Sequence, residues 1–207
     1  SWTIPSGELN ATAAIKIDLN KIEELGSLYD DYVLPLRITS STGEPMGQNK
    51  YTKVLAHIGF KNDYSGTYSG KGIITQQGTT YTTEITSTQL YAINNNICYM
   101  FVGEKTRANT PDYLNYVVEI KRDEWGGITL SSEVGSLEFK SYNSKLSRKY
   151  TYNYNDQRYY TEITTVELAY EYLDKTQSED LRMTFEGSFS MSRDVLRVEY
   201  PNVDVEE

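Results

Sequence analysis

The clearest hydrophobic pattern lies near the C-terminal end of the chain, in residues 160–193. Apolar and polar side chains alternate strictly in its second half, where one side carries Leu181, Met183, Phe185, Phe189 and Met191. The same period of two residues occurs earlier, in Val166, Leu168, Tyr170 and Tyr172. This period is typical of a strand with one buried face. The polar stretch 174–180 predicts a loop, so the pattern predicts a long antiparallel hairpin, which needs a larger sheet beneath it because isolated hairpins are marginally stable.

Short strand patterns separated by turn signals precede this hairpin. They occupy residues 67–75, 80–93, 97–103, 115–122, 128–131, 137–139 and 150–154. Gly66, Gly70 and Gly72 predict a bent or bulged first strand. Residues 97–103 are apolar on both faces and predict a buried strand. About eight or nine strands at this spacing predict an antiparallel, lipocalin-like β-barrel domain for residues 64–207.

Residues 1–61 predict a different all-β unit. Strand patterns occur at 2–5, 11–19, 33–38 and 51–60, with a short helical turn at 21–25. Tyr32 lies where a tyrosine corner would lie, just before a strand. An immunoglobulin-like sandwich has about seven strands, so we expect these residues to form its C-terminal half and the front half to lie upstream of Ser1. Residues 62–66 are the expected joint between the two units.

Composition and charge exclude several classes of partner. The chain has 207 residues and a net charge of −9, which argues against nucleic acid and anionic lipid, because both attract clustered Lys and Arg. No apolar run has the length of a transmembrane helix. Cys98 is the only cysteine, so no internal disulfide can form, and its apolar surroundings predict a buried, unreactive thiol. His57 is the only histidine, and we expect it to be structural.

No recognised catalytic motif occurs in the sequence, and we expect no enzyme activity. The segment 103–106 reads Gly-Glu-Lys-Thr, but it lacks the first glycine and the following helix of a phosphate loop. One His and one Cys cannot form a Cys/His zinc cluster, so neither a metal nor another cofactor is expected. A pair of carboxylates for glycoside hydrolysis stays open as an alternative, because their spacing is set in space and not along the chain.

Aromatic side chains with polar neighbours are the candidate binding residues. Sugars stack their C–H faces on such rings while amides, carboxylates and guanidinium groups bind the hydroxyls. The candidates are a tryptophan in a tight turn and a tyrosine-rich segment with its charged neighbours: Trp125, Tyr150, Tyr152, Tyr154, Asp156, Arg158 and Tyr160. We expect Tyr150, Tyr152 and Tyr154 to share one strand face. The alternative is that these tyrosines pack across strands and only hold the sheet together.

Several stretches together resemble a family of Bacteroidetes cell-surface lipoproteins. The matching segments are WTIPSGELNATAAIKIDL, YVLPLRITS, DYSGTYSGKG and LAYEYLD with LRMTFEGSFSMSR, at residues 2–19, 32–40, 63–72, 168–174 and 181–193. Members of this family pair an N-terminal immunoglobulin-like domain of unknown function with a C-terminal lipocalin-like domain, and they have no established catalytic residues. The resemblance implies a lipid anchor in the outer membrane, at the cell surface, through a missing N-terminal segment. It also implies an accessory role in polysaccharide uptake, with an oligosaccharide or polysaccharide and neighbouring outer-membrane uptake proteins as partners.

Three functions therefore compete. A surface glycan-binding protein would show an exposed aromatic platform with polar neighbours. A lipocalin-like carrier of a small apolar ligand would show an apolar cavity of ligand size. An unrecognised hydrolase would show a cleft in which two acids converge with shifted pKa values. We expect the first.

Overall fold

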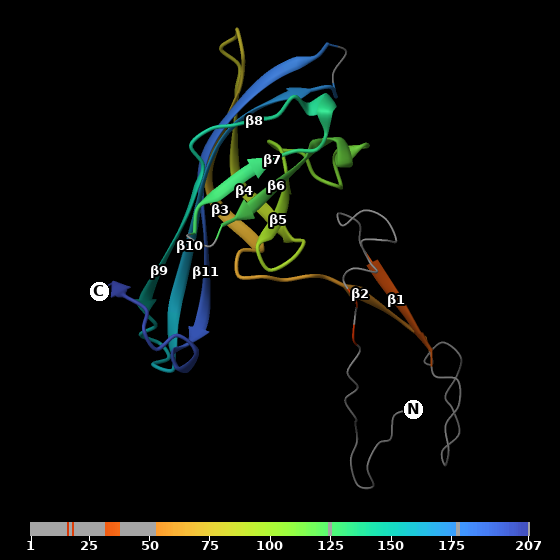
Figure 1. Ribbon diagram of the computed structural model, residues 1–207. Coiled ribbons are helices and arrows are strands. Elements are labelled where there is room, and N and C mark those ends of the chain that lie inside the picture. Colours follow the sequence, from red (N-terminus) through yellow and green to blue (C-terminus); the bar gives the residue numbers. More distant parts are fainter. Residues whose placement is uncertain are drawn as a thin grey trace.

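The computed structural model describes residues 16, 18, 32–37, 53–123, 126–176 and 179–206, and within this part of the chain the fold is all-β, with no α-helix. This confirms the predicted fold class. The strands form a two-stranded sheet and a ten-stranded sheet. Figure 1 shows the two-stranded sheet set apart from the large sheet, with the segment after β2 leading into it.

The small sheet pairs β1 (Tyr32–Arg37) with β2 (Lys53–Ile58) in antiparallel register. Pro35 lies opposite Leu55 in this ladder. A two-stranded sheet has only edge strands, where the missing N–H of proline is tolerated. The predicted strand 2–5 and helical turn 21–25 lie outside the described residues, as does 11–19 apart from Lys16 and Asp18. The predicted half-sandwich therefore stays a prediction beyond β1 and β2.

The large sheet contains all the other strands of the described residues. They are β3 (Gly66–Gln76), β4 (Thr82–Ala92), β5 (Ile97–Phe101), β6 (Val117–Arg122), β7 (Ile128–Ser131), β8 (Lys140–Ser141), β9 (Lys145–Tyr152), β10 (Tyr159–Asp174), β11 (Leu181–Leu196) and β12 (Val205–Glu206). Three short 3₁₀ helices connect them: η2 (Tyr113–Tyr116), η3 (Gly135–Leu137) and η4 (Arg197–Glu199). The strand order is β12-β9-β10-β11-β3-β4-β5-β6-β7, and β8 pairs with β10.

The predicted C-terminal hairpin is confirmed. Strands β10 and β11 pair over their full length, from Tyr159 opposite Leu196 to Asp174 opposite Leu181. Most of the apolar side chains predicted to face the core are buried: Val166, Leu168, Tyr170, Tyr172, Met183, Phe185 and Phe189. Leu181 and Met191 are half-buried and lie at the edge of the core. The period of two along each strand thus identified the core face correctly.

The large sheet curls around its main core, and a second, smaller cluster contains Ile93, Tyr99, Phe101 and Val117. Buried side chains from β4, β5, β6 and β7 join those of β3, β10 and β11 in the main core. The two-residue strand β8 pairs with β10 and lies against β7, so it bridges the two halves of the curl (Figure 1). The ladder nevertheless ends at β7 and at β12, and in the described part of the chain no pairing joins these edges. The sheet is therefore open, and the predicted lipocalin-like barrel is not confirmed.

Two glycines make room for the aromatic centre of the core. Gly72 of β3 lies opposite Gly187 of β11. The rings of Phe185 and Phe189 lie above this pair, nearly parallel, with centroids 6.2 Å apart. A methyl group at Gly72 would lie 2.6 Å from Cζ of Phe185. The ladder between β3 and β4 shifts register between Ser69 and Gly72, so the predicted bulge in β3 is also confirmed.

Three predicted strand positions differ in the structure. Residues 135–137 form the 3₁₀ helix η3 in place of the predicted strand 137–139, because Glu138 adopts a left-handed φ of 46° that ends extended backbone. Tyr116 lies in η2, one residue before β6 begins. Strand β9 ends at Tyr152, so Tyr154 lies beyond it. The last two differences fall at strand ends, and the first replaces a predicted strand of only three residues.

Candidate functional site

The two ends of β10 carry different groups of polar and aromatic side chains. The start of the strand holds Tyr160, in the sequence-predicted tyrosine segment, and its last residue is Asp174. A fully extended strand of this length spans on the order of 50 Å. The two ends are therefore separate candidate sites.

The structure brings part of the predicted tyrosine segment together. Tyr152 lies opposite Tyr160, and their ring centroids are 5.9 Å apart. The Arg197 guanidinium lies 5.1 Å from the Tyr152 ring centroid and 4.8 Å from the Tyr160 ring centroid. Tyr152 is 39% exposed. These three side chains form a small, partly exposed aromatic surface.

The remaining predicted residues do not join this surface as expected. Tyr154 is 84% exposed but follows the end of β9, so the prediction that it shares a strand face with Tyr150 and Tyr152 is wrong. The turn 153–156, in which the Asn153 side chain accepts two backbone N–H groups, has already left the strand. Trp125 lies outside the described residues.

The two charged members of the predicted site bind each other. Nη2 of Arg158 lies 2.6 Å from a carboxylate oxygen of Asp156, and its Nε also donates to this carboxylate. These hydrogen bonds lower the pKa of Asp156 to about 2. Because each charge already has a partner, this pair is less available for ligand hydroxyls than the sequence suggested.

Two residues further along β10, on the same face of the sheet as Tyr160, lies a buried ionic cluster centred on Glu162. Glu162 is fully buried, and its carboxylate accepts hydrogen bonds from Nε of Arg193 at 3.0 Å and from the Tyr150 hydroxyl at 3.1 Å. Arg148 lies 3.6 Å from the same carboxylate. Asp63, just before β3, lies 3.7 Å from Arg148 and 3.4 Å from Arg193. The Tyr150 hydroxyl is thus committed to the protein interior and not to a ligand.

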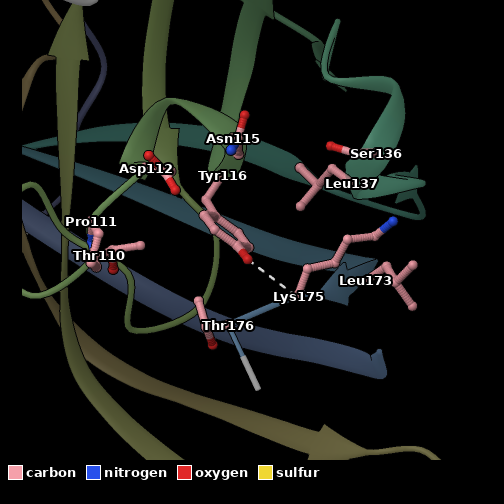
Figure 2. A pocket seen from close by; sticks show the side chains of 10 residues that line it. All are labelled: Thr110, Pro111, Asp112, Asn115, Tyr116, Ser136, Leu137, Leu173, Lys175 and Thr176. Carbon is pink, nitrogen blue, oxygen red and sulfur yellow. Dashed lines mark hydrogen bonds between the residues drawn. The ribbon is translucent and has the colours of Figure 1, made fainter. Parts of the chain in front are cut away.

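The opposite end of the sheet contains a cavity of about 300 Å³, which Figure 2 shows. Residues of the loop before η2, of η2 and η3, and of the end of the β10–β11 hairpin line it: Thr110, Pro111, Asp112, Asn115, Tyr116, Ser136, Leu137, Leu173, Lys175 and Thr176. Hydroxyl, amide and charged groups therefore surround one aromatic ring and two leucines.

Tyr116 is fixed in the wall of this cavity. Its hydroxyl accepts a hydrogen bond from the backbone N–H of Lys175 at 3.1 Å, drawn as the dashed line in Figure 2. Burial, together with the nearby charge of Asp174, raises the pKa of Tyr116, so the hydroxyl is neutral at physiological pH. The ring therefore offers a rigid apolar surface that joins η2 to the hairpin.

A shielded ion pair lies directly beside this wall. Nζ of Lys105 lies 2.8 Å from Oδ2 of Asp174 and 2.9 Å from the Thr176 hydroxyl, and it is 5.4 Å from the Tyr116 ring centroid. Thr176 also donates to Asp174 through its N–H and its hydroxyl. Burial opposes ionisation of Asp174, but the hydrogen bonds from Lys105 and Thr176 outweigh it and lower the pKa of Asp174.

Among the described residues, the cavity in Figure 2 does not assemble the acid pair that glycoside hydrolysis needs, because Asp112 contributes the one carboxylate in its lining. In the described residues, no three His, Cys, Asp or Glu side chains come together as metal ligands. Within that same part of the chain, no helix is long and apolar enough to cross a membrane.

The side chains that line the cavity in Figure 2 can hold a polar ligand through hydrogen bonds and through stacking on the Tyr116 ring.

Sequence reasoning missed this end of the sheet. Lys105 was considered only as part of a false phosphate-loop motif, and Asp174 only as the start of a loop. Their contact joins residues 69 positions apart, which no periodicity reports. One local signal was present: Asp followed two residues later by Thr, a spacing at which an aspartate side chain accepts backbone N–H groups in a turn.

A protein-family model covers more than half of the chain. This model, described as "-like, C-terminal", matches residues 52–190. No curated protein matches the chain.

Three solved structures share the fold. One is a multidomain protein including DUF1735 from Bacteroides ovatus, 16% identical, with a TM-score of 0.66 over 83% of this chain and 62% of that chain. Another is an auxiliary nutrient binding protein from Bacteroides thetaiotaomicron, 17% identical, with a TM-score of 0.65 over 80% of this chain and 58% of that chain. The third, of unknown function, is from Bacteroides ovatus, 18% identical, with a TM-score of 0.67 over 83% of this chain and 62% of that chain. The chain thus spans less than two thirds of each of these proteins.

Proposed function

Because this chain belongs to the family whose "-like, C-terminal" model matches residues 52–190, we propose that it is a non-catalytic nutrient-binding protein whose ligand is an oligosaccharide. The cavity beside Tyr116 carries this proposal. Its mixture of hydroxyl, amide and carboxylate groups around one ring suits a sugar, which presents hydroxyls at its edge and C–H groups on its face. Ligand sites commonly combine an apolar wall with a few convergent polar groups.

The comparison with solved structures supports the same function. One protein of this fold carries the name auxiliary nutrient binding protein. We place the present protein at the outer membrane, on the cell surface, as an accessory of a polysaccharide-uptake system, in agreement with the sequence resemblance. The proposal includes no catalytic step, because it assigns every polar group of the cavity to binding.

Two surfaces compete for the glycan within this proposal. The Figure 2 cavity is concave and polar, while the Tyr152–Tyr160–Arg197 surface is partly exposed and lies at the other end of β10. We favour the cavity because Tyr116 is held in place by the Lys175 backbone. A preorganised site loses less entropy on binding than exposed side chains do.

A glycan-array screen followed by calorimetric titration tests the proposal. Asn115→Ala in the cavity should weaken binding of the selected glycan by about fivefold, the effect of one lost hydrogen bond. Tyr152→Ala at the opposite end should leave the affinity unchanged, and Asn95→Ala, an exposed loop position, is the matched control. A loss in the Tyr152 variant alone would move the site to the tyrosine surface, and a chain that binds no glycan on the array would refute the function.

A further inference from the structure

A second cavity lies on the other side of the Lys105–Asp174 ion pair. It has a volume of about 390 Å³ and opens between β3, β4, the ends of β10 and β11, and the loop after β5. Ile74, Tyr172 and Met183 form its buried, apolar floor. None of its lining residues lines the cavity in Figure 2. The two cavities are therefore separate sites that share one wall.

The Tyr172 hydroxyl at this floor has no hydrogen-bond partner among the described residues. Tyr172 as a whole is 1% exposed, but its hydroxyl oxygen is not among the fully buried polar atoms without a partner, so this oxygen faces the cavity, where water can reach it. Its neighbour Tyr170 differs, because the Tyr170 hydroxyl accepts the N–H of Gly103 at 3.0 Å. Tyr172 lines a cavity in which a ligand could supply the missing partner.

The mouth of this cavity is negatively charged. Glu104, Asp174 and Glu179 line it together with one cation, Lys105. The ammonium of Lys105 is already taken up by Asp174, at 2.8 Å. Burial raises the pKa of Tyr172, and the charges of Asp174 and Glu104 raise it further, so the Tyr172 hydroxyl stays neutral in a negative potential. Such a site repels anions and attracts a cation.

We propose that this cavity binds the primary ammonium group of a small organic molecule. The ammonium donates a hydrogen bond to the Tyr172 hydroxyl and is stabilised by the carboxylates of Glu104 and Glu179. The exposed ring of Tyr81 at the rim contacts the body of the ligand, and aromatic rings near a cation add further attraction. The ammonium can come from an amino sugar or from an alkylamine, because both bodies fit a cavity with an apolar floor and a polar rim.

This site does not depend on the proposed glycan function. It lies across the Lys105–Asp174 wall from the cavity in Figure 2 and uses other side chains. A chain that binds an amine but no glycan on the array would refute the proposed function and leave this inference standing. A chain that binds a glycan but no amine would refute this inference and leave the proposed function standing.

Two matched pairs of probes isolate the charge: glucosamine against glucose, and hexylamine against 1-hexanol. Each pair is titrated into the full chain at low salt and neutral pH, and binding is followed by calorimetry. We expect the charged member of at least one pair to bind about tenfold more tightly than its neutral partner. The ammonium gains one hydrogen bond, to the Tyr172 hydroxyl, and the attraction of two exposed carboxylates, those of Glu104 and Glu179. The pair that shows the difference identifies the source of the ammonium.

Variants connect the binding to the named side chains. Tyr172→Phe and Glu104→Gln should each weaken binding of the selected amine by about fivefold. Glu186→Gln removes an exposed acid of β11 outside the cavity and should have no effect. Tyr172→Phe should also leave the melting temperature of the free chain unchanged or raised, because the hydroxyl it removes has no partner, while the amine-induced rise in melting temperature is reduced.

The inference fails if neither amine binds at millimolar concentration, or if each neutral partner binds as tightly as its amine. It also fails if Tyr172→Phe binds the amine as tightly as the wild type, or if this variant lowers the melting temperature of the free chain. In that last case the hydroxyl has a structural role in the core.

Discussion

The contact between Phe185 and Gly72 allows a sharp test of how the core is packed. Phe185 is 3% exposed, and its ring stacks on Tyr170 with centroids 4.7 Å apart. Phe185→Ala should lower the free energy of unfolding by roughly 3–5 kcal/mol, because it removes a buried ring and leaves a cavity. Gly72→Ala should lower it by about 1–3 kcal/mol, because the added methyl would overlap Cζ of Phe185 at 2.6 Å.

The two changes should not be additive. In the Phe185→Ala chain, the space left by the ring can accept most of the methyl group at position 72. Phe189, whose Cζ would lie 2.8 Å from that methyl, still limits the relief. We expect the double variant to be more stable than the sum of the two single effects predicts, by at least about 1 kcal/mol.

Urea denaturation followed by near-ultraviolet circular dichroism measures these free energies. Gly135→Ala is the matched control, because a methyl there meets no atom within 4 Å. Combined with Phe185→Ala, it should show no coupling. Additive costs for Gly72 and Phe185, or a neutral Gly72→Ala, would refute the close packing of this ring against the glycine pair.

Three further predictions concern single groups. The pKa of Asp174 is lowered in the folded chain, so its carboxylate stabilises the fold above the unfolded pKa of about 3.9. This contribution is lost as the pH falls through the folded pKa. When urea midpoints at pH 6 and pH 3 are compared, Asp174→Asn should therefore lose less stability than the wild type. Glu162→Gln should lower the free energy of unfolding by about 3 kcal/mol, because it leaves the guanidinium groups of Arg148 and Arg193 without their buried counter-charge; an unchanged urea midpoint would contradict this. Burial raises the pKa of Cys98 to about 11, so Ellman's reagent at pH 8 should label the thiol only after unfolding, and rapid labelling of the native chain would show that it is accessible.

The core of the large sheet was predictable because strand periodicity is a local property. Met183, Phe185 and Phe189 occupy one face of a strand whichever strand lies beside it, so their burial follows from the alternating pattern. Closure of the sheet could not be predicted in the same way. It depends on whether β7 reaches the other edge, and the short strand β8 occupies part of that region by pairing with β10.

The candidate sites were harder to predict because their residues meet only in space. The tyrosine segment was found by its composition, but Tyr154 leaves the sheet at a turn, and Arg197 enters from η4, a distant element. The Lys105–Asp174 pair joins a loop after β5 to the end of β10, and neither residue stands in a pattern. The unpaired hydroxyl of Tyr172 could not be inferred at all, because the sequence predicts only that its ring is buried.

The Lys105–Asp174 pair has a structural consequence for both proposed sites. Asp174 ends β10, and Thr176, which donates to it, lines the cavity in Figure 2, while Lys105 and Asp174 themselves line the second cavity. One ion pair therefore holds the end of the hairpin against the loop after β5 and positions a wall of each cavity. Because removing one partner of a shielded pair leaves the other charge uncompensated, a change at either residue should disturb both cavities. Single changes at Asn115 or Tyr172 should disturb one cavity each, so these are the positions at which the two binding activities can be separated.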